Sequence, residues 1–409
     1  MPFLGKTLGR ILAIEEDKVL LLRRGQRSQV KVKATHGAKP GDWVAIDPKG
    51  HVEVLTASKI TADRMRRESF TQRISDPRRL KGMKFRSQVE SGIRNFFLRQ
   101  DFLETRTPLL VPCPGMETHI RPIATTTGAY LPTSPEFAMK RLLVGGLEKI
   151  FQICPAFRSE PKSTTHHPEF TMLEWYRAFS GYEDVMADVE NLFEKLAMDL
   201  FGKPEIQFQG KRISVKTPWP RLRVRDLFQE FVGIDLVQNS KAEDLWKHCQ
   251  RLNLKEARAD ESWDDLYFRI WMNCIEPRLP DEQAVFVTRY PASQSALAVI
   301  DQDSDGTSWA KRFEVYAAGL ELGNAFEELT NPIEQRKRFE KDMETRVKTY
   351  GPEFPSTPID EGFIQALEEG MPPSAGIAMG VDRMVMLFAD EPDLDYTLWL
   401  GSTHTDPTN

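Results

Sequence analysis

The sequence predicts an α+β protein in which a small β-rich module precedes a large domain built on an antiparallel sheet. Short apolar–polar alternations separated by turn residues fill residues 1–60, a pattern typical of a small β-barrel of the OB-like kind. Farther along, neighbouring strand-like runs with helices appended take the place of the regular strand–helix repeat of parallel sheets. We therefore expect a module over 1–60, a linker over 61–79 and a main domain over 80–409.

The module is the basic part of the chain. Its expected strands cover 18–22, 29–34, 42–46 and 51–55. It carries 11 Lys+Arg against 6 Asp+Glu, whereas the remainder carries 44 against 54. A basic surface of this kind suits RNA or an acidic protein, and it equally suits a solvated face without function.

The composition is that of a soluble globular protein, with 40% hydrophobic and 28% charged residues. No run approaches the roughly 18 apolar residues that a membrane span requires, and the first residues lack the apolar core of a signal peptide. We expect a cytoplasmic protein without a membrane partner. The cysteines are scattered without a CxxC pair, which indicates neither a zinc site nor a disulfide framework.

The main domain is expected to open with an amphipathic helix over 81–100 and a strand over 102–110. Further strands are expected at 149–157, 169–179, 284–289, 312–329 and 374–380, and helices at 185–201, 245–253, 263–274, 333–348 and 381–388. No glycine-rich phosphate loop lies between a strand and a helix. If a nucleotide binds, charged side chains must therefore hold its phosphates.

The first group of candidate residues lies on a predicted hairpin. Arg158 ends the outgoing strand, and a rigid Arg can contact a phosphate through two parallel hydrogen bonds. The two-residue period of the returning strand puts Phe170, Met172, Glu174 and Tyr176 on one face. Taken alone, an Arg and a Glu beside a loop are more often a surface pair.

The second group is an acidic strand over 321–328. Strict alternation places Asn324, Phe326 and Glu328 on one face and Glu321 on the other, so Glu321 joins them only through a bulge or at a strand edge. Clustered carboxylates indicate a cation, either Mg²⁺ shared with phosphates or a substrate ammonium. A solvated edge strand is the alternative.

The third group is the glycine-rich strand over 374–380, which leads into a helix carrying Arg383 in its first turn. A cation is poorly placed there for the helix dipole, which indicates a functional role, although a solvated Arg is the commoner case. A guanidinium plane can stack on adenine while its charge faces the γ-phosphate, and Phe170 could cover the other face of the base.

In this order the three groups resemble motifs 2 and 3 of the class II aminoacyl-tRNA synthetases and the acidic strand between them. The helix leading into Phe102–Pro108 resembles motif 1, which builds the dimer interface in that family. The resemblance covers about residues 80–390. It implies a class II catalytic core, a homodimer, and the use of ATP with Mg²⁺ to form an aminoacyl-adenylate.

Within the family the chain resembles the lysine branch. That branch contains lysyl-tRNA synthetases and the ligases that attach (R)-β-lysine to a lysine of elongation factor P. Ser134-Pro135-Glu136, the stretch 291–298 and Ala378, where the tRNA enzymes have Gly, resemble the ligases. About 60 N-terminal residues are also few for the usual anticodon-binding domain. We therefore expect elongation factor P as the acceptor.

Two alternatives stay open. One is a lysyl-tRNA synthetase variant that charges tRNA, which the basic OB-like module favours. The other is a non-catalytic amino-acid sensor, against which the presence of both Arg158 and Arg383 speaks. One departure concerns ATP: His167 stands where both kinds of relative usually have Asn.

The resemblance also implies residue roles. The substrate carboxylate would attack the α-phosphate of ATP, with Arg158 and Arg383 as the catalytic residues and Mg²⁺ on Glu321 and Glu328. The implied ATP-binding residues are Arg158, Ser159, Glu160, His167, Phe170, Glu321, Leu322, Gly380 and Arg383. The implied residues for lysine or β-lysine are Ser134, Glu136, Tyr176, Asn324, Glu328 and Ala378.

Overall fold

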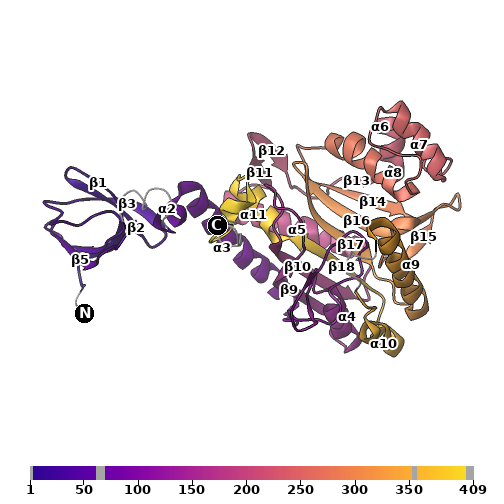
Figure 1. Ribbon diagram of the computed structural model, residues 1–409, viewed down its shortest axis with the longest axis horizontal. Helices are drawn as coiled ribbons and strands as arrows, with labels where there is room; N and C mark the ends of the chain where they lie inside the picture. The colour runs from indigo at the N-terminus through magenta and orange to yellow at the C-terminus, as the bar shows by residue number, and fades with distance from the viewer. Residues whose placement is uncertain (1–2, 61–69, 352–356, 402–409) are drawn as a thin grey trace. The chain divides into compact units, whose positions relative to one another are not determined.

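The computed structural model describes residues 3–60, 70–351 and 357–401 (Figure 1). The chain divides into two compact units, residues 1–88 with 393–409 and residues 89–392. Residues 61–69 of the predicted linker lie outside the described residues. The rest of that segment contains α2 (Phe70–Ser75) and the start of α3 (Pro77–Leu98).

The first unit contains a five-stranded antiparallel sheet in the order β3-β2-β1-β4-β5. Its strands are β1 (Thr7–Glu15), β2 (Lys18–Arg23), β3 (Gln26–Lys31), β4 (Trp43–Ile46) and β5 (Val52–Thr56). A bridge between Ala34 and His51 joins the segments that continue the two edge strands. Alternate apolar side chains, among them Ile11, Leu21 and Val44, form its buried core. This arrangement agrees with the predicted OB-like module.

The strand β1 is absent from the sequence prediction because its alternation is interrupted. The register with β2 shifts between Ile11 and Ala13, so a bulge lies at the apolar run 11–14. A bulge adds a residue to one strand and breaks the two-residue period by which a strand is identified in a sequence.

The C-terminal segment of the same unit is fixed by arginines of α3. The Arg79 guanidinium forms an ion pair with Asp395 (2.7 Å) and donates to the Leu398 carbonyl. Arg86 donates to the Thr397 carbonyl at 2.6 Å. Gly82 allows this approach, since a Cβ there would lie 2.3 Å from the Tyr396 carbonyl oxygen. Buried guanidinium groups thus satisfy carbonyls that would otherwise lack donors.

The second unit is built on a nine-stranded, mostly antiparallel sheet. Its order is β13-β14-β16-β17-β18-β10-β9-β6, with β15 paired to β16. The strands are β6 (Leu103–Glu104), β9 (Lys149–Phe157), β10 (Glu169–Ala178), β13 (Arg221–Arg223), β14 (Val285–Pro291), β15 (Ile300–Gln302), β16 (Ser308–Ala317), β17 (Leu320–Glu327) and β18 (Ser374–Gly380). Two short pairs, β7 (Ile123–Ala124) with β8 (Tyr130–Leu131) and β11 (Glu205–Phe208) with β12 (Lys211–Ser214), stand apart from it.

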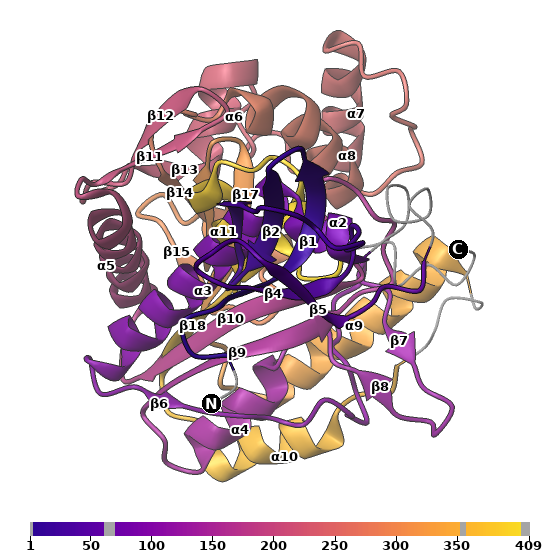
Figure 2. The same ribbon diagram turned by 90° about the vertical axis from the view of Figure 1, so that its left-hand side faces the viewer.

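Helices flank this sheet, which confirms the α+β prediction. They are α4 (Glu136–Val144), α5 (Tyr182–Phe201), α6 (Val224–Val232), α7 (Ala242–Arg251), α8 (Trp263–Ile270), α9 (Pro332–Tyr350), α10 (Glu361–Gly370) and α11 (Val381–Ala389). Figure 1 shows α6, α7 and α8 gathered beside β13 and β14, and Figure 2 shows α4 and α10 side by side. The predicted hairpin strands and the strand-to-helix step at 380–381 are confirmed.

The alternation of β10 distributes its side chains between the two faces of the sheet. Trp175 is fully buried, and its indole donates to Asp188 of α5 at 3.2 Å. Tyr176, one residue on, joins the cluster that α4, α9 and α10 form on the opposite face. Successive residues of a strand point to opposite sides, so the face away from α5 is the one that carries the candidate site.

Candidate active site

A polar row crosses the sheet at its centre. Glu174 of β10 pairs with Ala378 of β18, and Ala378 pairs with Asn324 of β17. The row continues to Gln152 on β9 and Glu314 on β16. Directly opposed residues share a face of a sheet. The sheet therefore brings Glu174, Asn324 and Ala378 together, with the Ala378 methyl between a carboxylate and an amide.

Glu174 is a buried carboxylate with one oxygen unused. It is 1% exposed, and the Tyr176 hydroxyl donates to its Oε1 at 2.7 Å. Its Oε2 is buried without a hydrogen-bond partner among the described residues. Burial raises the pKa of Glu174 well above its usual range, and Glu136 raises it further. A buried acceptor of this kind costs free energy unless a donor arrives, which is the behaviour expected of a ligand site.

A glycine fixes the position of the phenol. Gly376 pairs with Tyr176 across β18 and β10. A Cβ on Gly376 would lie 2.2 Å from the Tyr176 ring, a distance that no real side-chain contact allows. The tyrosine ring therefore lies over the glycine backbone, and this placement keeps its hydroxyl on Glu174.

A lysine of the chain itself lies among the pocket carboxylates. Lys140 of α4 is fully buried, and its Nζ lies 2.5 Å from Glu136 Oε1 and 2.5 Å from Glu328 Oε2. Burial opposes its charge, but Glu136 and Glu328 outweigh it and raise the pKa of Lys140. Burial raises the pKa of Glu328 too. The Lys140 ammonium thus brings together Glu136 and Glu328, two of the predicted substrate residues.

The acidic strand contains the bulge that Glu321 requires. Glu314 pairs with Asn324, while Tyr316 pairs with Glu321, so one extra residue of β17 lies between. Because Glu314 and Tyr316 share a face of β16, Glu321 lies on the same face as Asn324. Partial loss of hydration, with Glu314 nearby, raises the pKa of Glu321, whose side chain is still 42% exposed.

Arg158 ends β9 beside the hairpin loop, with its guanidinium 5.1 Å from the centre of the Phe170 ring. Its Nε is buried without a hydrogen-bond partner in the part of the chain that the structure describes. On the returning side, the His167 Nδ1 lies 2.7 Å from the Glu169 carbonyl oxygen and 3.3 Å from the Glu169 amide nitrogen. The His167 Nε2 is buried and unpaired within the described ranges. The loop thus offers a guanidinium N–H and an imidazole nitrogen to a ligand.

Arg383 is held at the opposite side of the loop. Its guanidinium donates to the Glu321 carbonyl at 2.6 Å and to the His166 Nε2 at 2.8 Å. His166 must be neutral to accept, and burial together with Arg383 lowers its pKa. Both arginines come from elements that border the polar row: Arg158 follows β9, which pairs with β10, and Arg383 lies in α11, which begins after the Met172–Gly380 pair.

The remaining predicted residues lie around this centre. Ser134 accepts a hydrogen bond from the Glu136 amide at 3.2 Å, at the start of α4. The Ser159 amide donates to the Arg121 carbonyl at 2.8 Å, and the Glu160 amide to the Arg158 carbonyl at 2.8 Å, so the loop backbone is ordered there. Two other predicted ATP residues belong to the strands, Leu322 in the bulged stretch of β17 and Gly380 at the end of β18.

The candidate set misses three side chains that the structure places in the site. Lys140 was recognisable only in part, because its spacing from Glu136 on a helix is visible but its contact with Glu328 is tertiary. Strand alternation places Glu174 on the correct face, but the predicted site residues do not include it. Arg312, which donates to the Asn324 side-chain oxygen at 3.0 Å, has no recognisable sequence signal.

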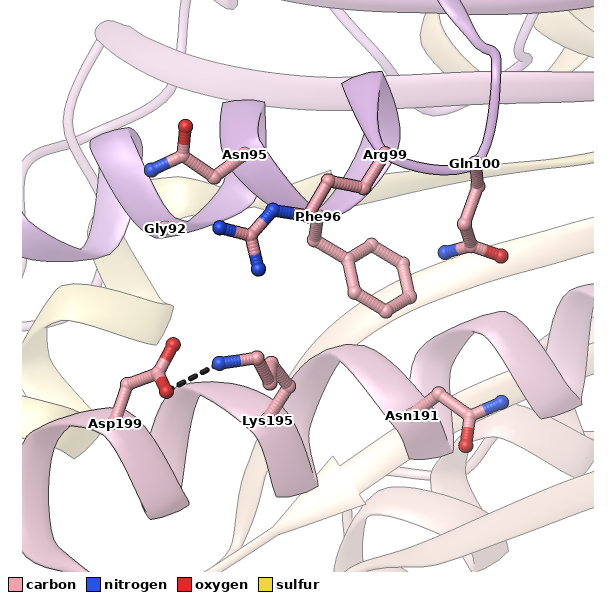
Figure 3. A pocket seen from close by; sticks show the side chains of 8 residues that line it. All are labelled: Gly92, Asn95, Phe96, Arg99, Gln100, Asn191, Lys195 and Asp199. Carbon is pink, nitrogen blue, oxygen red and sulfur yellow. Dashed lines mark hydrogen bonds and ion pairs between the residues drawn. The ribbon is translucent and has the colours of Figure 1, made fainter.

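A cavity of about 580 Å³ lies elsewhere in the second unit, and Figure 3 shows it between α3 and α5. Asn95 and Arg99 line one side, and the ion pair between Lys195 and Asp199 lines the other. None of the predicted site residues takes part in it. Size alone therefore does not identify the reactive site.

Across residues 3–60, 70–351 and 357–401, no group of three or more His, Cys, Asp or Glu is arranged to hold a metal ion by protein ligands alone. Within the same ranges, no helix is both long enough and apolar enough to cross a membrane.

Comparison with known proteins agrees with this geometry. The family model described as class II tRNA synthetases (D, K and N) matches residues 63–403. A lysine–tRNA ligase of Psychrobacter sp. is 38% identical over 311 residues, covering 75% of this chain and 59% of that protein. The lysine–tRNA ligase of Pelotomaculum thermopropionicum is 36% identical over 334 residues, covering 80% of this chain and 64% of that protein. The one of Syntrophomonas wolfei is 37% identical over 314 residues, covering 76% of this chain and 62% of that protein.

The match thus extends over most of the described second unit, while the chain spans only about 60% of the length of these curated relatives. It includes Arg158, Arg383, the polar row and the acidic strand. Sequence similarity and site geometry lead to one conclusion: the chain belongs to the class II tRNA synthetase family of the D, K and N group.

Proposed function

We propose that the chain uses ATP to activate lysine or (R)-β-lysine as an adenylate and then transfers it to a lysine side chain of elongation factor P. The observation that carries the first half is Glu174, a buried carboxylate with an unpaired oxygen set among further acidic groups. Such a group favours a cationic substrate, because a neutral one would leave its charge buried and unpaired.

The amino-acid pocket follows from the polar row. Glu174 and Tyr176 receive the side-chain ammonium, while Asn324, Ser134 and the free oxygen of Glu136 orient the backbone-like groups. Glu328 lies beside them and forms an ion pair with Lys140. Ala378 lies between Glu174 and Asn324, so its methyl limits the room near the substrate's amino and carboxylate groups. A methyl at this point is our basis for preferring β-lysine over α-lysine.

ATP binds over the hairpin loop and the start of α11. Arg158 contacts the α-phosphate as the substrate carboxylate attacks it and pyrophosphate leaves, and Arg383 neutralises the γ-phosphate. A preorganised contact of this kind is worth about 3 to 4 kcal/mol in the transition state. Glu160 and the Nε2 of His167 face the adenine, Phe170 covers its ring, and Ser159, Leu322 and Gly380 complete the surface.

The residues present fit a magnesium ion that ATP carries. Magnesium in such sites uses one or two carboxylates together with phosphate oxygens, and the bulge puts Glu321 where the phosphates would lie beside Arg383. Magnesium would supply charge neutralisation on the phosphates. The second carboxylate proposed for it, Glu328, is the one paired with Lys140, so Glu321 is the stronger candidate.

Different observations favour each of the two acceptors. Ser134 and Ala378 favour elongation factor P, because they resemble the corresponding residues of the β-lysine ligases. In favour of tRNA stand the names of the relatives, which are lysine–tRNA ligases, and the basic balance of residues 1–60. Both acceptors use the same adenylate, so the first chemical step does not discriminate between them.

A transfer experiment decides the acceptor. The enzyme is incubated with ATP, Mg²⁺ and labelled lysine or (R)-β-lysine, in parallel with elongation factor P and with tRNA specific for lysine. We expect label on elongation factor P, absent when its acceptor lysine is changed to Arg. Label on tRNA alone would refute the proposed acceptor and leave adenylate formation standing.

We also propose that the chain forms a homodimer through α3 and its surroundings. Leu98, at the end of α3, and Leu103, at the start of β6, are 53% and 54% exposed. Exposed apolar groups of this size often mark an interface. Light scattering after gel filtration should give twice the chain mass for the wild type and a shift toward monomer for Leu98→Asp. A monomeric wild type would contradict the assignment.

A further inference from the structure

The buried ammonium of Lys140 is unusual in its position. It comes from the middle of α4 and is 0% exposed, yet both of its close partners belong to the proposed substrate pocket, Glu136 one turn before it and Glu328 just after β17. The centre of the Phe363 ring lies 6.0 Å from its Nζ. An ammonium is buried in this way only when charged partners compensate for its lost hydration.

Each partner approaches the Lys140 Nζ with only one of its two oxygens, Oε1 of Glu136 as a hydrogen-bond acceptor and Oε2 of Glu328 as an ion-pair partner. A carboxylate can accept from both oxygens, so the other oxygen of each remains available to a ligand while the side chain is fixed. Burial pushes Glu328 toward its neutral form, and Lys140 acts against that tendency. The lysine thus sets both the orientation of two pocket carboxylates and the charge of one.

The charges in the pocket are matched to a diamino acid. When a cationic substrate favours their ionised forms, Glu136, Glu174 and Glu328 together oppose three negative charges to the one positive charge of Lys140. The balance is two negative charges, equal to the two ammonium groups of lysine or β-lysine. Without Lys140 the pocket would present three mutually repelling carboxylates, at least one of which would take up a proton or another cation.

From this geometry we propose that Lys140 is a specificity-determining positioning residue: a built-in counter-ion that aims Glu136 and Glu328 at the substrate and limits the pocket to two further ammonium groups. The assignment rests on the proposed function, since the substrate is the diamino acid named there. It differs from a direct substrate contact, because Lys140 acts through the two carboxylates.

The variant Lys140→Ala tests this by chemical rescue. The substitution removes three methylenes and the ammonium, the shape of n-propylammonium. In ATP–pyrophosphate exchange we expect KM for the amino acid to rise at least about tenfold, as for truncation of one partner in a buried charge pair, while KM for ATP stays unchanged. Added n-propylammonium should lower the raised KM, and n-propanol, which lacks the charge, should not.

Controls separate this role from a purely structural one. Lys203→Ala makes the same change at a lysine that is 58% exposed and should leave both KM values unchanged, with or without the amine. If Lys140→Ala does not fold, Lys140→Met keeps the volume without the charge and should show the raised KM without rescue. The amine should also raise the melting temperature of Lys140→Ala alone, a readout that is independent of activity.

Three outcomes would overturn the assignment. They are an unchanged KM in a folded variant, equal rescue by n-propanol, and a lowered KM, which would mean that Lys140 obstructs the pocket. Failure of the proposed function is distinguishable, because the wild type would then catalyse exchange with neither amino acid while the amine would still stabilise Lys140→Ala.

Discussion

Replacing Glu174 by Gln tests the pocket most sharply, because the change removes a charge and almost no volume. In the wild type the Tyr176 hydroxyl donates to Glu174 Oε1 at 2.7 Å, and Oε2 has no partner within the described residues. Gln can keep the tyrosine contact through its carbonyl oxygen. The amide then presents a donor where the substrate ammonium needs an acceptor.

The expected magnitude follows from the lost charge-assisted bond. Hydrogen bonds to charged groups contribute about 1.5 to 3 kcal/mol, which corresponds to a loss of about 10- to 150-fold in kcat/KM for the diamino acid. Stability should change in the opposite direction. Burial raises the pKa of Glu174 above its ordinary value of 4.5, so ionisation destabilises the fold increasingly as the pH rises above 4.5 toward the folded-state pKa. Near neutral pH the neutral variant should therefore melt at a higher temperature.

The assay is ATP–pyrophosphate exchange at saturating ATP, with thermal melting of the substrate-free protein beside it. Glu344→Gln, at an exposed position of α9, is the matched control and should change neither quantity. A Glu174→Gln variant with wild-type kcat/KM, or one that is less stable without substrate, would refute the reasoning about this carboxylate.

Three further predictions concern the surroundings of the pocket. Gly376→Ala should displace the Tyr176 ring, since the new Cβ would lie 2.2 Å from it. We expect denaturant titration to show a free energy of unfolding lower by about 1 to 3 kcal/mol, and an unchanged free energy of unfolding would contradict the packing. Arg383→Lys should raise KM for ATP about tenfold, because Lys cannot donate two parallel hydrogen bonds. An unchanged KM for ATP in exchange assays would exclude a role of Arg383 in binding ATP. His166 accepts a hydrogen bond from Arg383 only when neutral, and its pKa lies below 6.5, so KM for ATP should rise as the pH falls through that lower pKa. The plot of KM for ATP against pH should be flatter for His166→Gln, and identical plots for variant and wild type would count against the contact.

Much of the site could be predicted because it lies on regular strands. The two-residue period puts Phe170, Met172, Glu174 and Tyr176 on one face, and the unbroken register of β10 with β9 confirms it. The strand limits at 149–157 and 374–380 are also confirmed. In each case a local pattern contains the information, since alternation is a property of a single strand.

The parts that the sequence left undetermined depend on partners far away in the chain. The bulge that turns Glu321 onto the active face is defined by the register of β17 against β16, and no pattern within β17 determines it. Lys140 lies in an ordinary amphipathic helix, where a lysine is usually solvated. Its burial follows from Glu328, which tertiary packing brings to it. The roles of individual residues in binding ATP and substrate stay predictions.

The central claim is that this pocket selects an amino acid with two ammonium groups for adenylation. The most direct measurement is ATP–pyrophosphate exchange by the wild type with lysine, (R)-β-lysine and norleucine, which has the carbon chain of lysine but lacks the side-chain ammonium. We predict ATP-dependent exchange with at least one of the two diamino acids and at least about a hundredfold lower kcat/KM for norleucine, as expected when buried charges are left unpaired. Comparable exchange with norleucine, or none with either diamino acid, would contradict it.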